Sequence, residues 1–365
     1  SDRAVDETAA NYAKALSQAT TETNKALAIE GLGALKDEAA LPPLYAALTS
    51  EDAAVKVAAV EALSDWPNAA PLSKLREVAR TDKLVRALRG FVKLIGRAEG
   101  TTDEIAAMYR EAMDIAPDAE EKKAVLSGLA NRPSLAALKI ALAHLDNEAL
   151  EEEAEVAVAK IGAAISGGYP QEAKQALEQV IAQTDTEYAV STAKRALEQI
   201  DRFAEYVTAW ECAGPYSKTD VPGRKILDVR FPPEQEGEPV EWKVIPAGTH
   251  SGMPFLIELD KALGGNDCAG YLRTNLWSPT QQDARFEIGS DDGVKVWLNS
   301  EVVHANNVIR GNTPNQDKVD VTLVEGWNDL MLKISQGGGQ WTACLRVRSR
   351  DGEKLEGVRA SIKQE

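Results

Sequence analysis

The chain has 365 residues, of which 27% are charged and 44% hydrophobic, and its formal net charge at pH 7 is −16. Because a single hydrophobic core rarely serves more than about 250–300 residues, we expect two domains. The negative charge argues against nucleic acid or an anionic membrane surface as a partner, since both would be repelled. The sequence contains no run of about 18 apolar residues that would indicate a membrane span.

Residues 1–204 have the periodicity of helices. Apolar residues three apart lie on one helix face, and the second members of six such pairs recur at intervals of 31 to 39 residues: Leu32, Leu63, Leu94, Leu129, Ile161 and Ile200. Intervals of this length are typical of stacked helical hairpins, none of which can bury its apolar face alone. The small residues Gly31, Ala59 and Gly90 lie beside these anchors and would let neighbouring helices approach closely.

The segment 41–63 resembles a HEAT repeat. It has a first helix that starts with prolines (LPPLYAALTS, 41–50), an acidic turn at Glu51–Asp52, and a second helix that opens with Val55–Lys56, where the family favours Val-Arg. Proline suits the first positions of a helix. The resemblance covers roughly residues 5–200 and implies an α-α superhelix. Such a solenoid either holds other parts at a distance or binds a protein partner on its concave face.

Residues 205–365 predict an antiparallel β-sandwich or jelly roll. They contain all the tryptophans except Trp66, and glycine- and aspartate-rich turns separate short runs of alternating residues. Many short strands without helical crossovers are typical of these folds. The candidate strands are 207–214, 241–246, 254–260, 269–278, 284–290, 294–299, 301–305, 318–324, 327–335 and 341–349.

The segment 284–352 resembles the domain named after the protective antigen of a bacterial toxin. The shared features are a strand that ends in Ser-Asp-Asp-Gly (290–293), the strand that follows it, and a last strand that ends in an Asp-Gly turn (351–352). The resemblance implies a sandwich that often binds glycans, in which two adjacent acids joined by a cis peptide chelate Ca²⁺ in several members. The opening W-x-x-x-GPY (210–216) is similar to secreted bacterial proteins that append this sandwich to helical repeats, and implies a secreted, periplasmic or cell-surface location.

Asp291 and Asp292 are the candidate metal ligands. Calcium takes six to eight oxygen ligands, so amide and carbonyl oxygens from other loops are also required. Asn299 is the candidate third ligand, and the backbone of residues 337–340 is a further source of oxygen atoms. The alternative is that Asp291, Asp292 and Gly293 form a solvated turn, because aspartate and glycine commonly occupy turns.

Carbohydrate binding usually requires an exposed aromatic face beside amide or carboxylate groups. Trp341, which follows Gln340 and three glycines, is the first candidate for that face, and Trp277 is the second. Asn306 and Asn307 are candidate amides at the same end of the sandwich. The alternative is that most of these tryptophans pack in the core or between domains.

We expect a binding protein without catalytic activity. The sequence has no nucleophile-elbow, zinc-protease, Walker or dinucleotide-binding motif. Two adjacent acids in a turn do not form a glycosidase pair, whose carboxyl groups lie about 5–9.5 Å apart across a cleft. The expected function is carbohydrate recognition by the sandwich, presented on the helical repeats. The alternatives are a protein-interaction scaffold and an accessory region of a larger secreted enzyme.

The three cysteines are Cys212, Cys268 and Cys344. An odd number leaves at least one thiol free or paired with another chain. A Cys212–Cys268 disulfide and three thiols within a β core are both compatible with the sequence.

Overall fold

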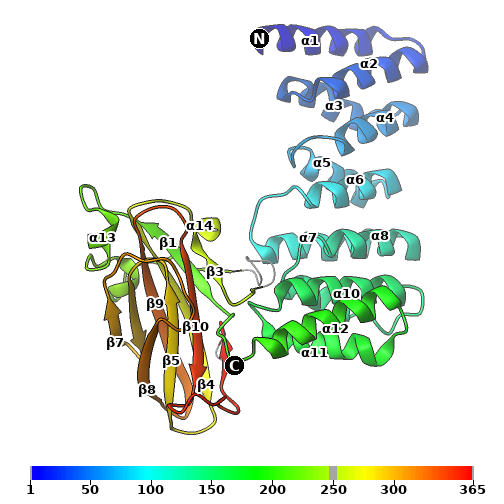
Figure 1. The fold of residues 1–365 in the computed structure, drawn as a ribbon. Coiled ribbons are helices and arrows are strands. Elements are labelled where there is room, and N and C mark those ends of the chain that lie inside the picture. The colour runs from blue at the N-terminus through cyan, green and yellow to red at the C-terminus, as the bar shows by residue number, and fades with distance from the viewer. Residues whose placement is uncertain (1, 246–252, 364–365) are drawn as a thin grey trace. The chain divides into compact units, whose positions relative to one another are not determined.

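A computed structural model describes residues 2–245 and 253–363 (Figure 1). A helical repeat region is followed by antiparallel sheets, so the fold class is α plus β, as predicted. By internal contacts the chain divides into two compact units, Ser1–Ile161 and Gly162–Glu365. The change from helices to strands falls between Arg202, where the last repeat helix ends, and Glu211, where the first strand begins.

The repeat region consists of helices that stack in chain order within the first unit (Figure 1). They are α1 (Asp2–Gln18), α2 (Glu22–Leu35), α3 (Leu41–Leu48), α4 (Ala53–Ser64), α5 (Leu72–Thr81), α6 (Val85–Ile95), α7 (Thr102–Ile115), α8 (Ala119–Leu129) and α9 (Leu135–Leu142), with the 3-10 turn η1 (Glu38–Ala40) before α3. Helix α10 (Glu151–Ile165) crosses the boundary between the units, and α11 (Pro170–Gln183) and α12 (Glu187–Arg202) belong to the second unit.

Local sequence explains where the helices of the HEAT-like segment begin. Prolines occupy the first turn of α3, where a missing N–H costs nothing. Asp52 caps α4, because its side chain accepts hydrogen bonds from the N–H groups of Ala54 and Val55. The predicted pair of helices with an acidic turn between them is therefore present.

The predicted apolar anchors form the core of the repeats. All are fully buried except the last, Ile200, which is half-buried at the end of α12. Gly90 lets α6 approach its neighbours, since a Cβ atom there would lie 2.0 Å from the Ser64 hydroxyl oxygen. Ion pairs also join successive hairpins: Lys25 with Asp52 at 2.9 Å, and Lys56 with Asp82 at 2.6 Å.

The second unit contains two antiparallel sheets. The seven-stranded sheet has the order β2 (Lys243–Val244), β1 (Glu211–Tyr216), β4 (Cys268–Ser278), β9 (Gly326–Gln336), β6 (Val294–Leu298) and β7 (Glu301–Asn306), with β11 (Arg359–Ser361) also pairing with β4. The four-stranded sheet has the order β3 (Ile257–Glu258), β10 (Thr342–Arg348), β5 (Gln282–Ser290) and β8 (Asp317–Leu323). Short helical turns occur in the segments that connect strands: α13 (Gly223–Ile226) and η2 (Pro232–Glu234) between β1 and β2, and α14 (Leu259–Ala262) between β3 and β4.

Each predicted strand has a counterpart. The segment 241–246 is shortened to β2, and its last residue, Pro246, lies outside the described residues. The segment 254–260 is shortened to β3, because the helical turn α14 begins at Leu259. Strand β11 was not predicted, because three residues are too few to show alternation.

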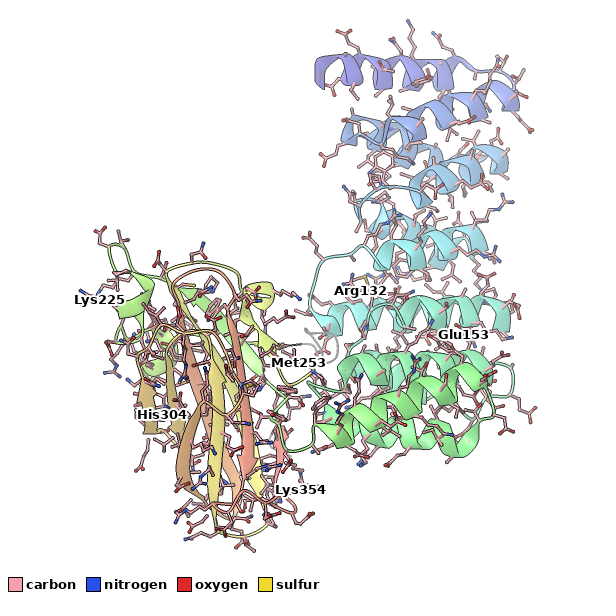
Figure 2. All side chains as sticks on the ribbon, in the orientation of Figure 1. Arg132, Glu153, Lys225, Met253, His304 and Lys354 are labelled. Carbon is pink, nitrogen blue, oxygen red and sulfur yellow. The ribbon has the colours of Figure 1, made fainter. Side chains whose placement is uncertain are left out.

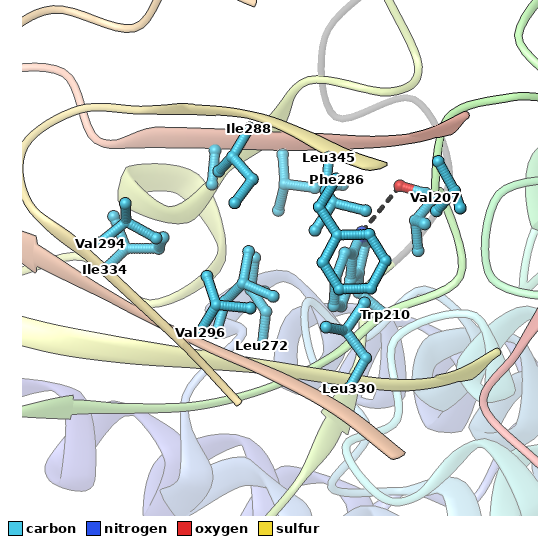
Figure 3. Close-up of a cluster of buried hydrophobic side chains, with 14 of the residues drawn as sticks. Val207, Trp210, Leu272, Phe286, Ile288, Val294, Val296, Leu330, Ile334 and Leu345 are labelled. Atoms are coloured by element: carbon cyan, nitrogen blue, oxygen red, sulfur yellow. Dashed lines mark hydrogen bonds between the residues drawn. The ribbon is translucent and has the colours of Figure 1, made fainter. Parts of the chain in front are cut away.

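The core of the sandwich lies between the two sheets (Figure 3). Leu272, Val296 and Leu330 contribute from the seven-stranded sheet, and Phe286 and Leu345 from the four-stranded sheet. Alternation decides which side chains enter, since successive strand residues point to opposite faces. Trp210 closes one side of this core, and its indole N–H donates to the Val207 carbonyl at 2.8 Å (Figure 3).

The three cysteines are free thiols buried in the second unit. Of the two arrangements left open by the sequence, the structure has the one without a disulfide. Burial raises the pKa of each thiol to about 11. Among the described residues, none of the helices combines the length and apolar character that crossing a membrane would require.

Candidate functional site

Asp291 and Asp292 lie in the turn between β5 and β6, where the chain passes from one sheet of the sandwich to the other. Strand β5 belongs to the four-stranded sheet and β6 to the seven-stranded sheet. The Asp291 N–H donates to the Thr342 carbonyl at 2.9 Å, and the Asp292 N–H donates to the Ser335 carbonyl at 3.1 Å. The peptide bond between the two acids is cis, as the family resemblance implies. Both acids therefore lie at one end of the sandwich.

The carboxylate of Asp292 holds two loops together. Its Oδ1 atom accepts from the backbone N–H of Arg310, and its Oδ2 atom accepts from the backbone N–H of Gly337, both at 3.0 Å. Hydrogen bonds to an ionised acceptor are stronger than neutral ones. Asp292 thus fixes the loops that follow β7 and β9 beside the turn.

Asp291 lies among other acids. Its side chain is half-buried, and burial raises its pKa to about 6, with further contributions from the negative charges of Asp292 and Asp260. Within the described parts of the chain, no donor or basic group bonds the Asp291 carboxylate. We call Asp260, Asp291 and Asp292 the acidic end of the sandwich.

A polar network orders the loop next to the acidic end. The Arg310 guanidinium donates to the Ser290 hydroxyl at 2.8 Å and forms an ion pair with Asp317 at 2.5 Å. Asp317 also accepts from the Asn306 amide at 3.0 Å, and the His304 Nε2 atom lies 3.4 Å from it (His304 is labelled in Figure 2). The Arg310 guanidinium is therefore already engaged by Asp317.

The predicted amide ligands do not gather at the acid pair. Asn299 lies in the turn at the opposite end of β6, and five residues at about 3.3 Å each place it roughly 16 Å away. Its amide instead donates to the Asn328 side chain at 3.0 Å. The expectation that Asn299 is a metal ligand is therefore wrong. Asn306 and Asn307 lie nearer, but their amides bond Asp317 and Asp228.

The predicted aromatic residues do not form one platform either. Trp341 is fully buried in the sandwich core, packed against Gly270, where a Cβ would lie 2.8 Å from the ring. This corrects the expectation that its face is exposed, although its neighbour Gln340 is exposed. Trp277 lies near the far end of β4, nine residues from Cys268 and roughly 30 Å along the strand. It packs edge-on against Trp327 with a centroid distance of 5.3 Å.

The acidic end can be compared with the ligands that calcium requires, because Asp291 and Asp292 place two carboxylates side by side. Asp291 and Asp292 offer hard oxygen ligands, and the mutual repulsion of the nearby acids is what a bound cation would relieve. In the described residues, no group of three or more His, Cys, Asp or Glu side chains is arranged to hold a metal ion. The remaining ligands would therefore be backbone carbonyls and water.

The structure also contains a large groove that the sequence did not indicate. It lies on the outer face of the seven-stranded sheet, between β1, β4, β6, β9 and the segment 232–242, and has a volume of about 1230 Å³. Trp242, Arg273, Trp297 and Met331 are among its lining residues. Outward-pointing Trp297 and Met331 alternate with core residues along β6 and β9, which is the only sequence signal for this surface.

The segment 232–242 is held against the sheet by a buried ion pair. The Lys333 side chain on β9 is fully buried, and its ammonium group lies 2.8 Å from the Glu234 carboxylate. The Tyr271 hydroxyl donates to the same carboxylate at 2.5 Å, and Lys333 also donates to the Val229 carbonyl. These contacts thus hold the segment 232–242, which forms one wall of the groove, against the sheet that forms its floor.

Helical repeats joined to a β-sandwich define the structural class. The sequence model of the family described as HEAT repeats matches residues 10–89. Residues 10–89 are therefore similar to HEAT repeats, which suggest a protein-interaction scaffold. No curated protein matches the chain.

Solved structures that are similar to this chain have low sequence identity to it. A β-glucosidase from Kluyveromyces marxianus in complex with glucose is 13% identical, with a TM-score of 0.28 over 39% of this chain and 17% of that one. The PA14 domain of the MpAFP antifreeze protein is 12% identical, with a TM-score of 0.25 over 44% of this chain and 76% of that one. The chain thus spans about a sixth of the β-glucosidase. The assignment of the sandwich to the protective-antigen type stays a prediction.

Proposed function

We propose that the protein is a non-catalytic binding protein whose β-sandwich recognises carbohydrate at the acidic end, with Ca²⁺ held by Asp291 and Asp292. The observation that carries the proposal is the half-buried Asp291 carboxylate, which faces Asp292 and Asp260 without a basic partner among the described residues. Unlike charges would stabilise this arrangement, and like charges destabilise it. The helical repeats would present the sandwich to its ligand.

Asp291 and Asp292 would have different roles in binding. Asp292 positions the loops of Arg310 and Gly337, and Asp291 supplies the carboxylate with free acceptor capacity. A bound Ca²⁺ would supply positive charge and open positions for sugar hydroxyl groups. The loops that Asp292 holds also carry an exposed amide, Gln340, and an exposed apolar side chain, Ile309 at 72%, which would contact the sugar.

Calcium binding is tested on the full chain by isothermal titration calorimetry with CaCl₂. We expect weak binding, on the order of 10⁻⁴–10⁻³ M, because only two carboxylates contribute. Asp291→Asn should abolish it while leaving the fold intact, since the Asp291 carboxylate makes no hydrogen bond among the described residues. Asp351→Asn, which removes an exposed acid in another turn, is the matched control.

Carbohydrate recognition is tested by a glycan array with CaCl₂ and with chelator. Binding that requires calcium and is lost in Asp291→Asn would support the proposal. A folded protein that binds calcium but no glycan would leave a structural metal site and contradict the carbohydrate function. A folded protein that binds neither would contradict both.

A protein-interaction scaffold is the second candidate, favoured by the HEAT-repeat match at residues 10–89. Chemical cross-linking of the full chain to its captured partners, followed by mass spectrometry, tests it. Cross-links within residues 10–89 would support the scaffold. Cross-links confined to the strands after Glu211 would contradict it.

The proposed cellular location follows from the similarity of residues 210–216 to secreted bacterial proteins. We infer a secreted, periplasmic or cell-surface protein, in which this region either acts alone or is an accessory part of a larger enzyme. The absence of catalysis is part of the proposal. It is supported by the adjacency of Asp291 and Asp292 and by the engagement of both Asp292 oxygens with backbone N–H groups, which argue against these two acids as an acid–base pair across a cleft.

A further inference from the structure

The groove on the outer face of the seven-stranded sheet is too large for an ordinary small-molecule site. Its volume of about 1230 Å³ exceeds the roughly 300–1,000 Å³ of typical small-molecule pockets. Its floor is the sheet itself, with Arg273 on β4 and Met331 on β9 facing outward. A groove of this volume on an open sheet face suits a length of polymer.

The wall of the groove is firm. Glu234 is held by Lys333 at 2.8 Å and by Tyr271 at 2.5 Å, and both of these partners are fully buried. Phe231 packs on the same cluster, with the Lys333 ammonium 5.1 Å from its ring centroid. A ligand would therefore meet a preformed surface, which lowers the entropic cost of binding.

Two half-buried tryptophans in the groove already face basic groups. The Arg273 guanidinium lies 4.2 Å from the ring centroid of Trp242, and the Lys295 ammonium lies 5.2 Å from that of Trp297. Cations within about 6 Å of an indole face are attracted by its quadrupole. Each ring thus already contacts a basic side chain of the protein, which shows that both indoles are placed where a cation or its alkyl stem can pack against them.

The charged lining is mainly acidic. Two of its carboxylates are neutralised within the chain, Glu211 by Arg273 at 2.8 Å and Glu234 by Lys333. Glu236 and Glu238 are exposed on the rim, and neither has a basic partner in the parts of the chain that are described. The rim therefore carries negative charge that a ligand can complement.

We propose that this groove binds a basic, lysine- or arginine-rich peptide segment of a partner protein. The rim carboxylates would pair with its cations, and Trp242 and Trp297 would contact the cations or their alkyl stems. An anionic ligand would be repelled by the rim. A neutral oligosaccharide could hydrogen-bond the rim carboxylates but would leave their charge uncompensated. A basic peptide would neutralise that charge and would also be steered by the net charge of −16. This site is distinct from the acidic end and does not depend on it.

The test uses the full chain and fluorescein-labelled octalysine, with octaglutamate and a glycine–serine octapeptide as controls, followed by fluorescence anisotropy. We expect octalysine alone to bind, and to bind less tightly as salt is raised. Glu236→Gln/Glu238→Gln should weaken binding about three- to tenfold at low salt, because each rim pair contributes modestly. Trp297→Leu should weaken it about fivefold.

The matched control is Glu325→Gln/Glu356→Gln, which removes the same charge from exposed positions of the sandwich outside the groove. It should leave octalysine binding unchanged. Equal weakening by the two double variants would overturn the proposal, because binding would then reflect net charge alone. Binding of cellohexaose in the groove without binding of octalysine would overturn it in favour of a carbohydrate site. Thermal unfolding should be unaltered in both glutamine variants, since all four side chains are exposed.

Discussion

The buried pair of Lys333 and Glu234 gives the sharpest prediction about stability. The Lys333 side chain is 0% exposed and that of Glu234 is 6% exposed, so the ammonium group is neutralised by this one carboxylate within 2.8 Å. Glu234→Gln keeps the shape but removes the counter-charge that lies 2.8 Å from the ammonium, and leaves only the weaker influence of Asp228. Breaking a buried pair from one side costs about 3–5 kcal/mol. We expect a loss near the lower limit, because the amide oxygen can still accept a hydrogen bond.

The double variant separates charge from packing. In Glu234→Gln/Lys333→Met no charge is buried, and methionine keeps the contacts with Phe231 and Tyr271. Replacing a buried pair by apolar groups is often neutral or stabilising. We therefore expect the double variant to regain most of the stability that the single variant loses.

The pH dependence follows from the direction of the shift. Burial lowers the pKa of Lys333 below its ordinary value of 10.5, although Glu234 opposes the shift. The folded state therefore releases the proton at a lower pH than the unfolded state does. The cost of burying the charge is present in full below the lowered pKa and disappears as pH rises toward 10.5. In Glu234→Gln the opposing contribution is lost, so this rise in stability should begin at a lower pH.

Urea unfolding of the full chain at pH 7 and at pH 9.5 measures these effects, with separate analysis of any transition of the repeats. A Glu234→Gln protein within about 0.5 kcal/mol of the parent at pH 7 would refute the reasoning. So would a double variant no more stable than the single one.

Three further predictions concern the rest of the chain. Gly90→Ala should destabilise the repeats by about 1–3 kcal/mol in urea unfolding, whereas Gly311→Ala, where a Cβ meets nothing within 4 Å, should not; equal effects would contradict close helix approach at α6. The three buried thiols, with pKa values raised to about 11, should react with a disulfide reagent at pH 8 only after unfolding, and rapid labelling of the folded protein would contradict their burial. Hydrogen bonds from Lys25 and Lys56 lower the pKa of Asp52 and Asp82 below 3.8. The stability that these acids contribute is therefore present above pH 3.8 and is lost as pH falls through the lowered values. Helicity that does not respond to pH in this range would refute this linkage.

Only part of the candidate site could be predicted from the sequence. Alternation and turn residues located β5, β6 and the acidic turn between them, because those signals are local. Asp291 and Asn299 lie at opposite ends of β6. The length of this predicted strand is enough to separate the two side chains. Trp341 was misplaced for a different reason. Its burial depends on Gly270, distant in the sequence, which makes room for the ring on a neighbouring sheet.

The sequence by itself determined the helical repeats, the antiparallel strands and the apolar anchors of the repeats, because periods of about 3.6 and 2 decide which side chains share a face. The tertiary structure alone decided which loops meet. It joined Asp292 to Arg310 and Gly337, and it placed Glu234 over Lys333 to build one wall of the groove. These contacts link residues 18 to 99 positions apart. Strand order and register determine such contacts, and no local pattern encodes them.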